Sequence, residues 1–288
     1  MTNKTIFVTG GTGNQGGAAA RNLGAKGFNV KVLTRKPHSP KALNLQKLNI
    51  ELVQGDLNDP ESYRAHLKEA YGVFSVQSFG NGVDTEIKEG ITLATAAKEA
   101  GVQHFLYSSV AGADQHTGVR HFESKLKIES HIRQIGLPFT IVRPVSFFEN
   151  FLIPQVKKGI LKGKLVQAIN QNTLQQYIAT EDIGKAAANI FMHAEEYIGK
   201  TIPLATEQLT TQQVAEKFSE VLNKNIEYKK LPLIITRLFL GYNLYKMFKW
   251  MNDKNSPKTG DVESTRNMIP DYTSLEQWIQ INFPLLPG

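Results

Sequence analysis

Five glycines fall within eight positions directly after a short apolar run, in the segment FVTGGTGNQGG of residues 7–17. The run before them is typical of a buried strand, and a helix-like stretch follows them. Glycines at such a junction allow a tight turn, a close approach of backbone N–H groups to an anion, and close packing of the helix on the strand. The dipole at the start of the helix favours the same anion. This feature predicts a dinucleotide pyrophosphate site at the first strand-to-helix turn.

Two registers of the glycine motif fit the segment. Gly11, Gly13 and Gly16 match G-x-G-x-x-G. With Gly10 in place of Gly11, the spacing matches a looser G-x-x-G-x-x-G. No Lys-Ser or Lys-Thr pair follows the last glycine, which excludes a P-loop. A tight turn that binds no ligand is the alternative. The residues expected at the phosphates are Gly10, Thr12, Gly13, Asn14, Gln15 and Gly16.

Strand and helix patterns alternate through residues 1–150, which predicts an α/β fold with a parallel sheet covered on both faces. We expect a doubly wound Rossmann domain there. Its strands are expected at Thr5–Thr9, Val30–Thr34, Ile50–Val53, Val73–Val76, Phe105–Ser108 and Phe139–Val142. Its helices are expected at Gln15–Ala25, Pro40–Leu48, Pro60–Ala70, Thr85–Ala100 and Arg120–Ile135.

Residues 151–288 are expected to form a smaller α/β cap that binds substrate and packs on the sheet. Short strands are predicted at Gln175–Ala179 and Thr201–Leu204, in a returning segment near 175–205 that joins the sheet. Helix N-caps are predicted at Thr180, at Thr210 in a capping box with Gln213, and at Thr273 in a capping box with Glu276.

Composition narrows the function classes. The hydrophobic fraction of 41% and the charged fraction of 20% are those of a globular protein. The absence of cysteine excludes disulfides, thiolate catalysis and cysteine-ligated metals. The histidines show no metal-binding spacing, so no metal site is expected. No apolar signal-like stretch is visible at the start, which favours a cytoplasmic location.

A basic excess is concentrated near the end of the chain. The net charge is +7, and residues 224–258 carry eight Lys or Arg against two acidic residues. A local excess can serve an anionic cofactor or a membrane face, so nucleic acid is not the expected partner. Within it, Leu231–Met251 is unusually apolar but is interrupted by charges, which argues against a membrane span. A packed or lid-forming helix is favoured. A membrane-surface helix with Lys246 and Lys249 at the headgroups is the alternative.

The end of the second strand favours NADP(H) over NAD(H). Thr34 is followed by Arg35 and Lys36, where an NAD site usually has an acidic residue for the ribose 2′-hydroxyl. A guanidinium suits a 2′-phosphate, although two solvated surface cations are the alternative. Further cofactor contacts are expected where the third and fourth strands end. These residues are Asp56, which is otherwise a helix N-cap, with Leu57, Gln77 and Ser78.

Six segments resemble the extended short-chain dehydrogenase/reductase superfamily, and more narrowly its NmrA-like branch. They are VTGGTGNQGG, VLTRKP, VQGDLND, LYSSVAG, HFESK and TIVRPVSFFENF. The resemblance implies a Rossmann domain that binds NADP(H) or NAD(H). Some members of the branch reduce quinones or other small carbonyl-type acceptors. Others have lost turnover and report the nicotinamide balance by binding a partner protein.

The resemblance places a catalytic pair on the helix after the fifth strand. The superfamily has Tyr-x-x-x-Lys there, and this chain has His121 and Lys125. A spacing of four puts both side chains on one helix face. His121 is expected either to donate a proton or to have no turnover role. Lys125 is expected to bind the nicotinamide ribose. Ser108 is expected at the cofactor and Ser109 at the substrate carbonyl.

The loop after the sixth strand is expected to border the nicotinamide, because ligands of doubly wound sheets bind at the carboxyl ends of strands. Its cofactor contacts are predicted at Pro144, Val145 and Ser146. Its substrate contacts are predicted at Phe147, Phe148 and Asn150, although at least one phenylalanine of the segment is expected in the core.

Together these features favour an NADPH-dependent oxidoreductase that acts on a small planar acceptor such as a quinone or a conjugated carbonyl. The alternative is a redox sensor without turnover, in which NADP(H) binding alters a surface for a partner protein. The histidine in place of tyrosine favours the sensor, and the aromatic segment favours the enzyme.

Overall fold

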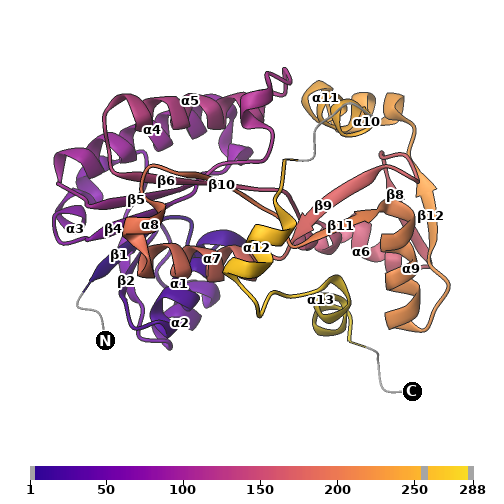
Figure 1. Cartoon of the computed structure of the whole chain (residues 1–288), viewed down its shortest axis with the longest axis horizontal. Coiled ribbons are helices and arrows are strands. Elements are labelled where there is room, and N and C mark those ends of the chain that lie inside the picture. Colours follow the sequence, from indigo (N-terminus) through magenta and orange to yellow (C-terminus); the bar gives the residue numbers. More distant parts are fainter. Residues whose placement is uncertain (1–3, 254–258, 285–288) are drawn as a thin grey trace.

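A parallel sheet of seven strands, in the order β10-β6-β5-β4-β1-β2-β3, forms the centre of the larger part of the molecule (Figure 1). The computed structural model describes residues 4–253 and 259–284. The strands are β1 (Thr5–Val8), β2 (Asn29–Thr34), β3 (Glu51–Gln54), β4 (Gly72–Ser75), β5 (His104–Ser108), β6 (Phe139–Pro144) and β10 (Thr201–Leu204). All six strands expected in the first part of the chain are confirmed within a residue or two.

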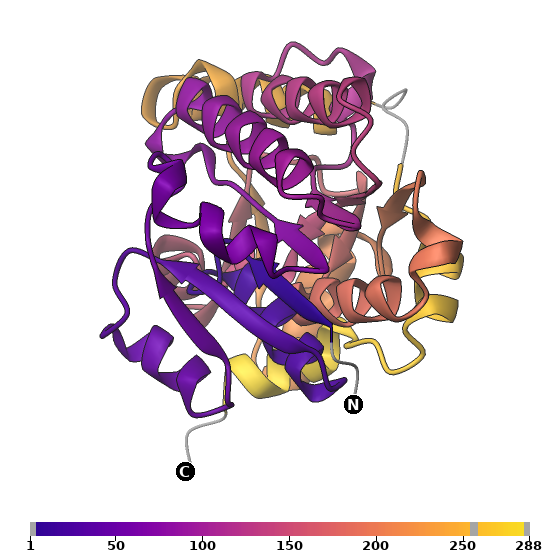
Figure 2. The same ribbon diagram turned by 90° about the vertical axis from the view of Figure 1, so that its left-hand side faces the viewer.

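Successive side chains of each strand point to opposite faces of the sheet, so both faces are apolar and both are covered by helices. Ile6 and Val8 of β1 face one apolar cluster, and Phe7 faces the other, so all three are fully buried. Helices α4 and α5 lie side by side over one face, and α1 and α7 cover the opposite face (Figures 1 and 2). The helices of this part are α1 (Asn14–Ala25), α2 (Pro40–Gln46), α3 (Arg64–Lys68), α4 (Val83–Glu99), α5 (Arg120–Gln134), α7 (Thr180–Met192) and α8 (Ala194–Tyr197).

The connection from β3 to β4 crosses back over β1 and reverses the direction in which strands are added. Strands β2 and β3 extend the sheet on one side of β1, and β4, β5 and β6 extend it on the other. A crevice for ligands opens at such a switch point, outside the carboxyl ends of the strands. The glycine segment, which follows β1, lies at this point.

The rest of the chain forms a smaller mixed region with its own core. Strands β7 (Ser146–Phe147), β9 (Leu174–Ile178) and β11 (Glu207–Thr210) form one sheet, and β8 (Lys164–Gln167) pairs with β12 (Glu227–Lys230). Its helices are α6 (Pro154–Leu161), α9 (Thr211–Leu222), α10 (Leu233–Phe239), α11 (Tyr242–Met251), α12 (Val262–Met268) and α13 (Leu275–Asn282). The returning segment is divided, because β10 joins the main sheet and β9 joins the smaller one.

Two of the three predicted helix caps are corrected. The capping box of Thr210 and Gln213 is confirmed at α9. The other box uses Ser274 with Gln277, one residue beyond the predicted pair of Thr273 and Glu276. Thr180 is the first residue of α7, not its N-cap. Its backbone N–H is bound instead by a carboxylate from another element, Glu149, at 3.1 and 3.2 Å.

The apolar segment Leu231–Met251 forms two short helices, not one. The break falls at Gly241, whose φ of +85° is favourable only for glycine. In the described ranges 4–253 and 259–284, no helix has both the length and the apolar character needed to cross a membrane.

Candidate functional site

The glycine loop folds so tightly that a Cβ would collide with neighbouring atoms at several of its positions. Gly10 has a φ of +63°, and its carbonyl accepts a hydrogen bond from the N–H of Gly13 at 2.8 Å. A Cβ at Gly16 would lie 2.4 Å from the carbonyl oxygens of Gly10 and Thr9, which real contacts do not allow. The first turn of α1 is therefore pressed against the end of β1. This is the reason that the motif needs its last glycine.

The start of α1 presents backbone donors to the crevice. In the described part of the chain, the N–H groups of Asn14, Gln15 and Gly16 have no hydrogen-bond partner, and Gly13 has no side-chain cap. Gly10, Gly13 and Asn14 are exposed at the carboxyl edge of the sheet. Donors of this kind, together with the helix dipole, fit a pyrophosphate.

Two cations follow β2 beside the crevice. The side chain of Arg35 is 66% exposed, and one of its guanidinium nitrogens lies 3.9 Å from a carboxylate oxygen of Asp56. Lys36 is also exposed. At that distance the ion pair is loose, so the guanidinium is free to turn toward a phosphate. The two cations lie where the sequence predicts them, one strand away from the glycine loop.

Asp56 lies in a turn after β3. Its carboxylate accepts the backbone N–H of Asn58 at 2.9 Å, which lowers the pKa of Asp56. The 3₁₀ turn at Pro60–Ser62 has Asp59 as its N-cap, so the alternative capping role for Asp56 is not observed. Leu57 packs against the core under α3 and α4. An adenine-contacting role for Asp56 and Leu57 stays a prediction.

A buried ion pair lies under the end of β4. The Nζ of Lys125 on α5 lies 2.9 Å from Oε1 of Glu86 on α4, and it donates to the carbonyl oxygen of Gln77 at 3.0 Å. The other oxygen of Glu86, which is fully buried, accepts the hydroxyl of Ser124 at 2.5 Å. Burial lowers the pKa of Lys125, and Glu86 opposes that shift. An ammonium has three N–H donors, so one is left after these two contacts.

His121 lies one turn before Lys125 and is held on two sides. Its ring stacks on Phe79, with centroids 4.7 Å apart, and its Nδ1 lies 2.7 Å from the side-chain nitrogen of Asn243 on α11. The oxygen of the same amide accepts the backbone N–H of Arg120 at 2.8 Å. A backbone N–H only donates, so this contact fixes which end of the Asn243 amide faces each partner.

The amide orientation in turn fixes the histidine tautomer. Because the nitrogen of Asn243 donates to Nδ1, the proton of the neutral ring is on Nε2. Burial is the largest cause that lowers the pKa of His121, which favours the neutral ring. The Nε2–H has no partner in the described part of the chain. It is a hydrogen-bond donor available to a ligand.

The two serines after β5 differ in their partners. The hydroxyl of Ser108 donates to the side-chain oxygen of Gln15 at 2.6 Å, which links β5 to the glycine-loop helix. The hydroxyl of Ser109 donates to Glu129 at 2.5 Å, and Glu129 is paired with Arg143 at 2.7 Å. Ser109 is therefore engaged with a buried ion pair that α5 contributes one turn after Lys125. Its predicted role at the substrate is not tested by this contact.

The loop after β6 divides between the crevice and the core. Pro144 ends β6, the N–H of Val145 donates to the carbonyl of Leu204, and Ser146 begins β7. Phe147 is half-buried and Asn150 is exposed. Phe148 is fully buried between Tyr177 and Trp278, so its predicted contact with substrate is wrong. Its ring completes the core of the smaller region.

Ser78 and Gln77 border the same crevice from β4. Ser78 is exposed, and its hydroxyl accepts the N–H of Gly80. The side-chain nitrogen of Gln77 donates to Ser75, and its backbone carbonyl accepts from Lys125. The predicted residues therefore lie at the carboxyl ends of six strands, β1 to β6, and Phe148 is the one that the core takes up instead.

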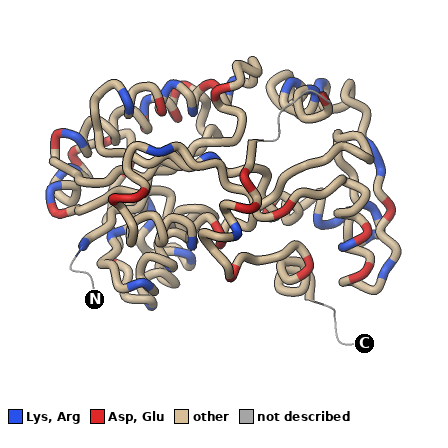
Figure 3. The backbone as a smooth tube through the Cα atoms, viewed as in Figure 1, with Lys and Arg blue, Asp and Glu red and all other residues tan. Residues whose placement is uncertain are grey.

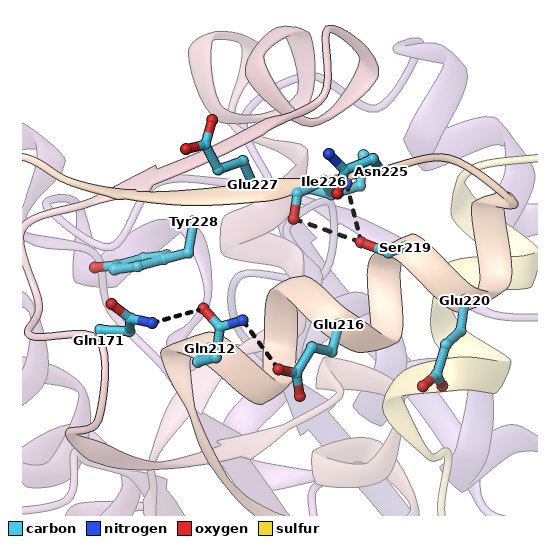
Figure 4. Close-up of a pocket in the computed structure, with 9 residues that line it drawn as sticks. All are labelled: Gln171, Gln212, Glu216, Ser219, Glu220, Asn225, Ile226, Glu227 and Tyr228. Carbon is cyan, nitrogen blue, oxygen red and sulfur yellow. Dashed lines mark hydrogen bonds between the residues drawn. The ribbon is translucent and has the colours of Figure 1, made fainter.

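A separate hollow of about 530 Å³ lies between α9 and β12, at the end of the molecule away from the main sheet (Figures 1 and 4). Gln171, Gln212 and Glu216 form a chain of side-chain hydrogen bonds along it. It carries no unpaired buried charge and no link to the glycine loop. Among the described residues, no cluster of histidine and carboxylate side chains suited to a metal ion occurs.

Three residues of the site were not predicted from the sequence. Glu86 is an acidic residue within a helical pattern, and only its burial against Lys125 reveals its importance. Phe79, in the 3₁₀ turn Phe79–Asn81, and Asn243, on a helix distant in sequence, both contact His121. The one available signal was that Glu86 falls on the apolar face of α4 with Leu93 and Ala97, where a charge requires a partner.

The chain matches the NmrA-like family over residues 2–279. An NmrA-like family domain-containing oxidoreductase, malD of Malbranchea aurantiaca, is 32% identical over 261 residues, covering 79% of this chain and 76% of that protein.

Solved structures show the same fold. The negative transcriptional regulator NmrA in complex with NADP has a TM-score of 0.80 at 24% identity, covering 99% of this chain and 96% of that one. The same regulator has also been solved with NAD. An NADPH-dependent quinone oxidoreductase of Escherichia coli, complexed with NADPH, has a TM-score of 0.80 at 22% identity, covering 96% and 99%.

Proposed function

This chain belongs to the NmrA-like family, and we propose that it binds NADP(H) in the crevice and transfers hydride to a small planar acceptor such as a quinone or a conjugated carbonyl. The observation that carries the cofactor proposal is the glycine loop. It combines the close packing of Gly16 on β1, free N–H donors and two exposed cations one strand away. The oxidoreductase malD and the quinone oxidoreductase complexed with NADPH support the same class of activity.

The residues of the chain have separable tasks in this proposal. The N–H groups at the start of α1 bind the pyrophosphate, and Arg35 with Lys36 binds the 2′-phosphate. The remaining donor of Lys125 binds the nicotinamide ribose. When bound, NADPH supplies the hydride. Glu86 and Gln77 hold the ammonium of Lys125 in place before the cofactor arrives.

His121 acts on the acceptor as a neutral donor. Its lowered pKa and its Nδ1 contact leave an Nε2–H that can hydrogen-bond an oxygen gaining negative charge. Solvent then protonates the product. A neutral imidazole suits a quinone or enal, whose reduced form spreads its charge, better than a simple ketone. This is the physical reason for proposing a conjugated acceptor.

A second candidate is a sensor in which NADP(H) changes the surface around Phe79 and α11. It is favoured by the ring contacts that hold His121 between Phe79 and Asn243. It is also favoured by the NADP complex of the regulator NmrA. In this role the protein would act by binding a partner protein.

Titration of the purified protein with NADPH and NADH by fluorescence tests the cofactor. Tighter binding of NADPH is expected, equal affinities would remove the argument from Arg35, and binding of neither would end the proposal. NADPH oxidation with a panel of quinones and enals then separates the candidates. Tight NADPH binding without turnover would leave the sensor.

The His121→Ala variant tests the donor. A loss of about tenfold or more in kcat is expected if Nε2–H stabilises the reacting oxygen. His131→Ala, on the same helix and half-exposed, is the matched control and is expected to keep its kcat. An equal effect of both variants would show that the loss comes from the helix and not from a hydrogen bond to the acceptor.

A further inference from the structure

Helices α10 and α11 leave a large apolar surface without a partner. Phe239 is 81% exposed and Leu238 is 72% exposed, although both are large apolar residues. Ile234, Leu240 and Tyr242 are also exposed, and α11 contains no fully buried residue. We call these five residues the hairpin patch. Single exposed apolar residues are ordinary, but several on one helical hairpin mark a surface that binds a protein or a membrane.

The other side of α11 is fixed to the main domain. Trp250 packs edge-on against Phe122, with ring centroids 5.5 Å apart, and Asn243 bonds the start of α5. The ammonium of Lys246 donates to the carbonyl of Gly118 at 3.3 Å. The hairpin is therefore held in place along one side while the hairpin patch faces outward.

The surroundings of the hairpin patch are basic. From Tyr228 to Asn252 the sequence contains no Asp or Glu. It contains Lys229, Lys230, Arg237, Lys246 and Lys249, and Figure 3 shows basic segments along the hairpin and β12. Lys254 and Lys258 of the same basic segment lie outside the described residues.

The charges decide between the surfaces that could cover the patch. Lys229 is paired with Glu227, but among the described residues no ion pair involves Arg237 or Lys249 of the hairpin. A second copy of the chain would bring these cations face to face, which disfavours self-association. The described helices are too short to span a bilayer. Exposed Phe and Leu beside Lys and Arg are instead the composition of helices that lie in the interface of an anionic bilayer.

We propose that the hairpin patch docks the protein on an anionic membrane surface, with Phe239 and Leu238 among the acyl chains and the surrounding cations at the headgroups. Arg237 lies over the Tyr242 ring at 5.7 Å, and Lys249 of α11 is exposed. Arg237 is thereby held beside the apolar residues, where a long side chain reaches the headgroups. The inference is independent of the cofactor and of turnover.

Flotation with vesicles of phosphatidylcholine and phosphatidylglycerol in equal parts tests the proposal, with phosphatidylcholine vesicles alone for comparison. The protein is expected to float with the anionic vesicles, without NADPH, and to be released by salt because exposed charges are screened. The double variant Leu238→Ser, Phe239→Ser is expected to lose about tenfold or more in partition, since large apolar groups no longer enter the bilayer.

Ile281→Ser is the matched control, because Ile281 on α13 is 72% exposed, the same fraction as Leu238, and lies outside the hairpin. It is expected to bind vesicles as the unmodified protein does. Three results would overturn the proposal: no flotation of the unmodified protein, equal flotation with neutral vesicles, or equal losses in the two variants. A dimer in light scattering that the double variant abolishes would assign the patch to a second copy instead.

Discussion

Replacing Glu86 by Gln isolates the buried charge that holds Lys125. The substitution keeps the shape of the side chain and an oxygen for Ser124, and it removes the negative charge 2.9 Å from the ammonium. Lys125 then keeps only the carbonyl of Gln77 in a site from which solvent is largely excluded. The variant therefore tests the ion pair and not the packing.

The expected cost follows from the distance and the burial. At 2.9 Å and an effective dielectric constant of about 20, the two charges attract by about 6 kcal/mol. The ammonium is partly compensated by Gln77, and removing one partner of a buried pair costs about 3–5 kcal/mol in comparable cases. We expect a loss of that size in the free energy of unfolding, a large share of the roughly 5–15 kcal/mol available to a folded protein.

Urea unfolding followed by circular dichroism measures the loss, and its pH dependence checks the cause. Burial lowers the pKa of Lys125 below the 10.5 of an unfolded lysine, and further so without Glu86. The unfolded chain then binds the proton more tightly, so the stability of the variant should rise as pH increases toward 10.5. Recovery at alkaline pH would identify the unpaired ammonium as the source.

Two further variants make the prediction refutable. Glu61→Gln removes an exposed partner of Arg64 and should leave the free energy of unfolding unchanged within error. The pair Glu86→Leu, Lys125→Met should recover much of the stability while losing NADPH affinity. A cost below about 1 kcal/mol for Glu86→Gln would refute the reasoning. It would mean that Lys125 reaches solvent.

Three other predictions concern the loop, the cofactor and pH. Gly16→Ala should cost about 1–3 kcal/mol in unfolding free energy and weaken NADPH binding, whereas Gly24→Ala, whose Cβ would have a normal 3.9 Å contact, should not; equal effects would remove the steric argument. Arg35→Ala should weaken NADPH binding about tenfold or more in fluorescence titration and leave NADH binding nearly unchanged; a parallel loss for both would place Arg35 away from the 2′-phosphate. Burial lowers the pKa of His104 to about 4, so the protein should lose about 3 kcal/mol of stability as pH falls from 6.5 to 4. His104→Asn should flatten that part of the thermal-unfolding profile, and an unchanged slope would assign the loss to other groups.

The site residues that the sequence predicted belong to motifs that lie close in sequence to a strand. The glycine spacing, the basic residues after β2 and the pair His121–Lys125 are all close in sequence to the strands that position them. Parallel strands bring their carboxyl ends to one edge, so these groups converge by topology alone. The contacts made by Glu86 and Asn243 depend on which helices pack together, and that is decided by side chains along the whole interface.

In the aromatic segment after β6, local sequence did not predict which side chains are buried. Phe147, Phe148 and Phe151 have the same composition and neighbouring positions, but Phe148 and Phe151 fill the core of the smaller region while Phe147 is only half-buried. Their orientation is set by Tyr177 and Trp278, which come from later in the chain. The N-cap of α13 is Ser274 and not the predicted Thr273. These two adjacent residues both fit the capping-box pattern, so the pattern alone does not choose between them.

The amino-acid sequence by itself determined the doubly wound sheet and the glycine loop, because strand periodicity and the steric needs of a tight turn act within a few residues. Tertiary structure alone decided that Lys125 is paired with Glu86, that Asn243 fixes the proton of His121 on Nε2, and that the apolar segment breaks at Gly241 and faces outward. These contacts join residues far apart in the sequence and depend on how the whole chain packs, so local sequence patterns do not predict them.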